Sequence, residues 1–87
     1  MKYRKKPVVI DAMLYDGTNR HACMLFLGKQ PLTQDREVSK STIIVQTDEG
    51  IMQARVGDWL IRGIKGEYYP CKPDVFELTY EKEKENV

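Results

Sequence analysis

Hydrophobic and polar positions alternate at the start of the chain and predict a β-strand over residues 8–15. One side of this strand is formed by Val8, Ile10, Ala12 and Leu14. The residues between them are also largely apolar, so we expect a central strand that is covered on both faces. Pro7 is tolerated because it precedes the strand.

A helix is predicted over residues 19–27, where apolar residues recur with the helical period. Asp16-Gly17 is a turn signal, and Thr18 is a good N-cap residue. Gly28 should end the helix. The apolar stripe of the helix should pack on the sheet, and it consists of Ala22, Leu25 and Phe26, widened by Cys23 and Leu27.

Residues 29–41 are polar, lack periodicity and contain Pro31, which is typical of an exposed loop. At most a weak strand is expected at residues 36–38. The sequence does not predict the conformation of this loop.

Two β-hairpins follow. β-Branched residues 42–47 and residues 51–56 flank a turn at residues 48–50, and residues 59–62 and 67–70 flank a glycine-containing turn. We expect the last three of these strands to follow one another as a meander, with Pro70 ending the final one because it lacks an N–H group. The core face of residues 51–56 should carry Met52, Ala54 and Val56.

The C-terminal part of the chain predicts one helical turn at residues 71–76, with Pro73 at its first position and Asp74 beside the helix start. Residues 77–80 then alternate as a short closing strand. The remaining residues 81–87 form a charged, solvated tail.

Together these elements predict one α+β domain over residues 1–80, in which a helix covers a small antiparallel sheet that can curl into a partly open barrel. Exposed strand edges in so small a sheet also favour a homodimer. The expected core includes Trp59, Phe26, Phe76, Val8, Ile10, Ile44 and Leu60.

Composition narrows the class of protein. Eighty-seven residues suffice for one domain. Because 14 basic residues are nearly balanced by 13 acidic ones, the net charge is too small to attract nucleic acid or a membrane surface electrostatically. No apolar run has the length of a membrane span or secretory signal, so we expect a cytoplasmic protein without membrane contact. In that reducing compartment Cys23 and Cys71 should be thiols rather than a disulfide.

Metal and catalytic sites are not expected. His21, Cys23, Cys71 and Asp74 would supply four zinc ligands, but His21 and Cys23 lie two apart on a helix and therefore point in different directions. The zinc deaminase signature also fails, because Cys23 occupies the position of its glutamate. Turn formation accounts for Gly57, Gly63 and Gly66, and Asp58 is a turn-former. We therefore predict neither an enzyme nor a cofactor.

A basic and aromatic surface is the best remaining signal for function. Basic groups can hold phosphate while aromatic rings stack on a base. Because side chains alternate along a strand, only one of the adjacent residues Tyr68 and Tyr69 should face inward. The other would be exposed and could contact a nucleotide or a protein. The candidate binding residues are Arg62, Lys65, Tyr68, Tyr69 and Lys72.

Two stretches, YRKKPVVIDAMLYDG and VGDWLIRGIKGEYYPCKPDVFELTYE, are similar to a group of small proteins encoded in bacteriophage and prophage genomes. The likeness covers about half the chain. The resemblance implies, by association, a non-catalytic accessory protein in the bacterial cytoplasm. Its expected partner is a host macromolecule, and the leading hypothesis is a host protein. The alternative is a module that binds nucleotides or nucleic acid.

Overall fold

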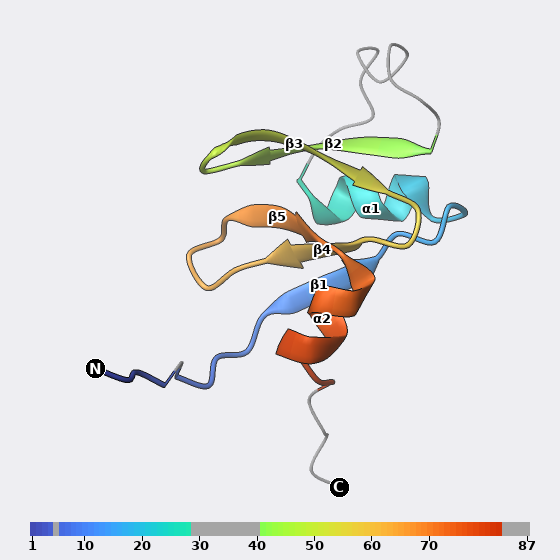
Figure 1. Ribbon diagram of the computed structural model, residues 1–87. Helices are drawn as coiled ribbons and strands as arrows, with labels where there is room; N and C mark the ends of the chain where they lie inside the picture. Colours follow the sequence, from blue (N-terminus) through green and yellow to red (C-terminus); the bar gives the residue numbers. More distant parts are fainter. Residues whose placement is uncertain (5, 29–40, 83–87) are drawn as a thin grey trace, which may run out of the picture.

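The structure is a computed structural model that describes residues 1–4, 6–28 and 41–82. Its five strands and two helices form an α+β fold, which confirms the predicted class, and the described residues contain no closed barrel (Figure 1). The elements are β1 (Asp11–Leu14), α1 (Arg20–Phe26), β2 (Thr42–Thr47), β3 (Gly50–Arg55), β4 (Trp59–Arg62), β5 (Tyr68–Cys71) and α2 (Pro73–Thr79).

The strands form two separate antiparallel sheets. β2 pairs with β3, while the other sheet has the order β1-β4-β5. Both predicted hairpins are confirmed, but β5 continues through Pro70 to Cys71 instead of ending at Pro70. The predicted three-strand meander is wrong, because β3 does not pair with β4. The two sheets contact each other through β5, which approaches both β2 and β3.

The first strand is shorter and more peripheral than the alternation indicates. β1 covers only Asp11–Leu14 and lies at the edge of its sheet, with β4 at the centre. Val8 is exposed and Ile10 is half-buried, so neither belongs to the core as predicted. The prediction failed because apolar residues on both faces of a segment do not determine how many neighbouring strands it acquires.

The connection into α1 is held by side-chain hydrogen bonds. The amide of Asn19 donates to the carbonyl of Leu14 over 2.7 Å, and its oxygen accepts from the N–H of Asp16 over 3.0 Å. Thr18 donates both its N–H and its hydroxyl to the Asp16 carboxylate, which lowers the pKa of Asp16. The N-cap residue is Asn19, not Thr18, and its side chain makes no capping hydrogen bond to the helix. The predicted end of the helix at Gly28, which has a φ of 72°, is confirmed.

A turn with a β-bulge carries the chain from the hairpin into the other sheet. Gly57 has a φ of 98°, and the N–H of Asp58 donates to the carbonyl of Arg55 over 2.9 Å. Tyr15 donates its N–H to the Asp58 carbonyl, and its own carbonyl accepts the N–H of Gly57. Gly57 and Asp58 therefore both lie opposite Tyr15, which is the defining feature of a β-bulge. The positive φ explains why glycine stands at position 57.

The main core lies between α1, the β2–β3 hairpin and one face of the three-stranded sheet. Leu60 is buried as predicted, whereas Trp59, Phe26 and Phe76 are only half-buried. β2 turns Ile43 inward instead of Ile44. Of Met52, Ala54 and Val56, which were expected in the core, only Ala54 is buried. The buried cluster consists of Tyr15, Cys23, Met24, Leu27, Ile43, Val45, Ala54 and Leu60.

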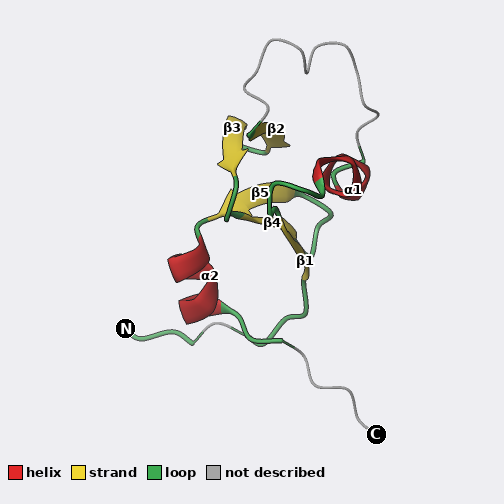
Figure 2. Ribbon diagram, turned by 90° about the vertical axis from the view of Figure 1, so that its right-hand side faces the viewer, coloured by secondary structure: helices red, strands yellow, loops and turns green. Residues whose placement is uncertain are grey.

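The C-terminal element is a helix throughout. α2 begins at Pro73 as predicted, but it continues to Thr79 in place of the expected closing strand. Phe76, Leu78 and Tyr80 alternate as in a strand, yet Phe76 and Tyr80 are also four residues apart and share one side of a helix. Figure 2 shows α1 and α2 on opposite sides of the three-stranded sheet.

Other predictions concern the cysteines and the loop. Cys23 is buried, Cys71 is half-buried, and both are free thiols. Burial raises the pKa of both thiols. The predicted loop at residues 29–41 lies, except for its last residue, outside the described residues. Along the described ranges, no helix combines the length and the apolar character that crossing a membrane requires.

Candidate functional site

The two faces of the sheet β1-β4-β5 carry different side chains. Strand pairing places Leu14, Trp59 and Cys71 in one row and Ala12, Ile61 and Tyr69 in the next. Side chains alternate along a strand, so these rows lie on the face opposite to Leu60 and the main core. We call this face, which α2 covers, the aromatic face.

Aromatic rings join α2 to the aromatic face. Trp59 and Phe76 stack with their ring centroids 4.0 Å apart and their planes 6° from parallel. Phe76 also contacts the ring of Tyr80 at 5.3 Å. The hydroxyls of Tyr80 and Tyr69 share a hydrogen bond of 3.1 Å. Burial, followed by this hydrogen bond, raises the pKa of Tyr69 far above its ordinary value.

A groove lies beside this cluster. Its volume is about 720 Å³, which falls within the range of roughly 300–1,000 Å³ that is common for binding pockets. The N-terminal segment before β1 and the chain after α2 both contribute to it. The lining residues are Val8, Val9, Ile10, Ala12, Trp59, Phe76, Tyr80, Glu81 and Lys82.

The walls of the groove keep apolar surface in contact with solvent. Val9 is 69% exposed and Val8 is 41% exposed. On α2, Val75 and Leu78 lie outside the lining of the groove, but they are three residues apart and also exposed, although Phe76 packs against Trp59. α2 therefore has apolar residues on two sides, whereas a helix that packs on one surface normally needs one apolar stripe. Contiguous exposed apolar surface is typical of an interaction site.

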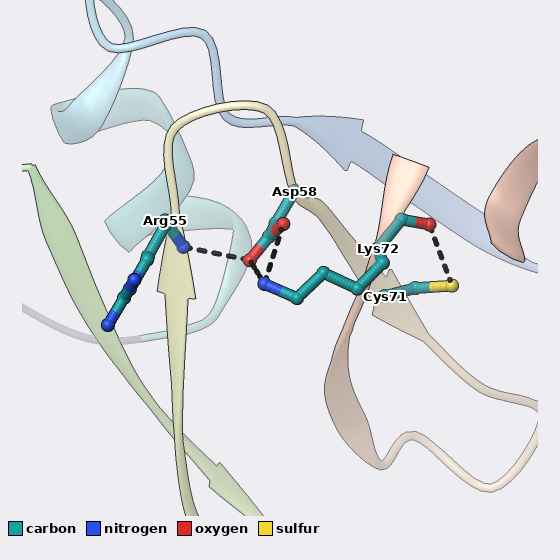
Figure 3. Close-up of polar contacts among 4 residues, drawn as sticks. All are labelled: Arg55, Asp58, Cys71 and Lys72. Atoms are coloured by element: carbon teal, nitrogen blue, oxygen red, sulfur yellow. Dashed lines mark hydrogen bonds and ion pairs between the residues drawn. The ribbon is translucent and has the colours of Figure 1, made fainter. Parts of the chain in front are cut away.

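A polar cluster lies at the β3–β4 turn, close to the start of α2 (Figure 3). One carboxylate oxygen of Asp58 accepts the N–H of Arg55 over 2.9 Å, and the same oxygen lies 3.1 Å from the Lys72 ammonium. Asp58 is almost completely buried, whereas the side chain of Lys72 is 63% exposed. The hydrogen bond from Arg55 agrees with the prediction of Asp58 as a turn-former, and the ion pair, which was not predicted, links the turn to the residue that precedes α2.

The five predicted binding residues do not form one patch. Lys72 pairs with Asp58, Tyr69 bonds with Tyr80, and Tyr68 packs edge-on against Phe26 at 6.0 Å. Both tyrosines are half-buried on opposite faces of the sheet, so the expectation of one inward and one exposed tyrosine is wrong. These contacts account for Tyr68, Tyr69 and Lys72 without a ligand.

The other two candidates are exposed: Arg62 is the last residue of β4, and Lys65 lies in the β4–β5 turn. Gly63 donates its N–H to the carbonyl of Glu67 over 2.8 Å, and the Glu67 carboxylate accepts the N–H of Lys65 over 3.1 Å. That carboxylate lies where a Cβ at position 63 would be placed, and Gly63 does not have the positive φ that was expected for it. The glutamate therefore stabilises the turn that presents Lys65.

The groove was missed by sequence reasoning because four of its lining residues, Val8, Ile10, Trp59 and Phe76, were assigned to a core. One sequence signal points to it in retrospect: Val8 and Val9 are adjacent apolar residues that precede the first strand. Such an excess of apolar positions over what a thin fold can bury is a signal for a binding surface.

Among the described residues, no group of three or more His, Cys, Asp or Glu side chains is placed to hold a metal ion. No protein-family model matches the chain, and comparisons with curated proteins and with solved structures return no match. The resemblance to bacteriophage proteins therefore stays a prediction from the sequence.

Proposed function

We propose that this protein is a non-catalytic binding module whose groove takes an apolar segment of a partner protein. The observation that supports the proposal is the groove itself, with a volume of about 720 Å³ and an apolar lining. Val9 in its wall stays 69% exposed, so an apolar side chain of a partner can bury surface there that the fold leaves in water.

The charge around the groove favours a particular kind of segment. Arg4 and Lys6 are exposed and come shortly before the lining residues Val8 and Val9, from which Pro7 separates them, while the two charged lining residues, Glu81 and Lys82, have opposite signs. A partner whose apolar anchor is accompanied by acidic residues would place its negative charge beside this basic stretch. The proposed partner is thus a protein segment with a large apolar side chain next to acidic residues.

The groove contains its own spectroscopic reporter. Trp59 is the only tryptophan of the chain and lines the groove, so its fluorescence will respond to an occupant. The experiment selects binders from a displayed random-peptide library against the whole protein and titrates the best synthetic peptide by Trp59 fluorescence. We expect the selected peptides to share an apolar anchor with acidic neighbours.

A matched pair of variants tests the location. Val9→Asp places a charge in the wall of the groove, and Ile51→Asp places one at a similarly exposed aliphatic residue on the β2–β3 hairpin, with 69% and 67% exposure respectively. Val9→Asp should abolish peptide binding, and Ile51→Asp should leave it unchanged. Equal loss in both variants, or selection of peptides without an apolar anchor, would reject the proposal.

The alternative function, binding of nucleotides or nucleic acid, relies on Arg62 and Lys65, which remain exposed at the β4–β5 turn. The test is titration with a single-stranded oligonucleotide at rising salt. Binding that weakens steeply with salt and disappears in Arg62→Glu or Lys65→Glu would favour this alternative over the groove.

The biological setting that we propose, an accessory protein of a bacteriophage or prophage acting on a host protein in the bacterial cytoplasm, is supported by the sequence resemblance. Phage structural and replication genes flanking the coding sequence would support this setting. A consistent position among host metabolic genes would contradict it.

A further inference from the structure

β1 is an edge strand, and its hydrogen-bonding directions can be assigned. Tyr15, which continues β1, donates its N–H to the Asp58 carbonyl over 2.9 Å and accepts the N–H of Gly57 over 2.7 Å. The backbone of Tyr15 therefore points toward β4. In an antiparallel pair, the backbone groups of successive residues point alternately toward and away from the partner strand.

This alternation places the N–H and C=O groups of Ala12 and Leu14 on the open side of β1, and those of Ile10 follow if the strand is extended by one residue. The carbonyl of Leu14 confirms the assignment, because it accepts a hydrogen bond from the Asn19 side chain rather than from β4. An extended chain can pair with this open edge through Ala12 and the N–H of Leu14 without disturbing the β1–β4 ladder, since only the Leu14 carbonyl is already engaged by Asn19.

We propose that the open edge of β1 pairs with the same edge of a second copy of this chain, antiparallel and about a two-fold axis at Ala12. Ala12 would then face Ala12 of the second copy, and Ile10 would face Leu14. These residues make a self-complementary set, which is what a two-fold symmetric interface requires. Leu14 is 38% exposed in the single chain and becomes covered in the pair.

The charges agree with this register. Asp11 faces Met13 of the second copy, so no like charges stand opposite each other. Asp16, which is exposed, comes next to Val8 and close to the basic Lys6 of the other chain. An axis at Asp11 would instead bring two aspartates together, so charge disfavours that register.

The pairing also determines where the two grooves lie. Ile10 and Ala12 line the groove with their side chains while their backbones face the open edge. A continuous six-stranded sheet would hence carry both grooves on the same face, one on each side of the axis. A partner with two apolar segments could engage both, which raises its apparent affinity. The dimer itself does not depend on the proposed function of the groove.

Ala12→Pro tests the pairing with little expected effect on the fold, because the N–H that proline removes points away from β4 and edge strands tolerate proline. The mass of the full chain is measured by light scattering over a concentration series. We expect a reversible monomer–dimer equilibrium for the unaltered chain and at least about tenfold weaker association for Ala12→Pro, since two symmetric hydrogen bonds are lost. Far-ultraviolet circular dichroism checks that the variant is folded.

A second measurement covers the case in which Ala12→Pro fails to fold. In a Cys71→Ser background, Ala12→Cys should form a disulfide-linked dimer under mild oxidation, because directly opposed residues of this kind are about 5.5 Å apart between Cα atoms, within disulfide range. Asp48→Cys, in the exposed hairpin turn, is the control and should not cross-link. A monomer at all concentrations, a dimer that survives in folded Ala12→Pro, or equal cross-linking of both cysteine variants would overturn the proposal.

Discussion

The two faces of the three-stranded sheet share the same strands but differ in how well they are covered. On one face, Leu60 is fully buried under α1 and the β2–β3 hairpin. On the aromatic face, Ile61 is fully buried, but Trp59, Phe76 and Tyr80 remain half-exposed beside a groove. The cover there is a helix of seven residues.

This difference indicates that apolar surface on one face is buried and stabilises the fold, whereas part of the apolar surface on the aromatic face stays accessible for binding. A small domain has few elements with which to cover a sheet, so a face that receives one short helix keeps apolar surface available. We infer that the covered face contributes most of the free energy of unfolding. The aromatic face contributes less and is where an occupant can bind.

The largest expected effect is on the covered face. Leu60→Ala should lower the free energy of unfolding by about 2–5 kcal/mol, because it leaves a cavity in the main core. Phe76→Ala, on the aromatic face, should cost about 1–2 kcal/mol because its ring is already partly in water. Urea unfolding followed by circular dichroism measures both. A larger loss for Phe76→Ala would invert the comparison.

The next effect concerns the turn that joins the sheets. Asp58→Ala should cost about 1–3 kcal/mol, because it leaves the N–H of Arg55 without its acceptor. Lys72→Met is the control and should cost less than about 1 kcal/mol, since the side chain of Lys72 is 63% exposed. If both substitutions have the same effect in urea unfolding, the ion pair rather than the backbone hydrogen bond holds the turn.

A smaller effect is expected from the tyrosine pair on the aromatic face. Tyr80→Phe removes its hydrogen bond with Tyr69 and should cost about 0.5–1.5 kcal/mol. It should also lower the pKa of Tyr69, because that hydrogen bond contributes to raising it. Absorbance of tyrosinate during an alkaline titration reports the shift. Tyr3→Phe, at a residue that is 87% exposed, serves as the control.

The smallest expected effect is a loss of stability at alkaline pH that depends on the Cys71 thiol. Burial raises the pKa of the Cys71 thiol above its ordinary value of 9.0, so the neutral thiol contributes stability below that pH. This contribution is lost as the pH rises through the higher pKa of the folded state. Cys71→Ser should therefore lose less stability than the unaltered chain between about pH 8 and about pH 10. An equal loss in urea midpoints would show that this thiol does not contribute.

Local signals predicted the elements better than their arrangement. The β-branched run at residues 42–47, the turn glycines and Pro73 act within a few residues, and the hairpins and the start of α2 were predicted from them. The candidate site was not predicted. Lys72 and Tyr69 were selected as binding residues for their side-chain types. In the structure they interact with Asp58 and Tyr80, which are more than ten positions away in the sequence.

The sequence by itself determined the two hairpins, the end of α1 at Gly28 and the thinness of the core, because backbone geometry and composition are local or additive properties. Only the tertiary structure decided that β1 pairs with β4, that Tyr15 is buried and that residues 77–79 are helical. Each of these depends on which segments far apart in the sequence pack together, and a pattern of alternating apolar residues is compatible with several such arrangements. The groove on the aromatic face is a consequence of that choice.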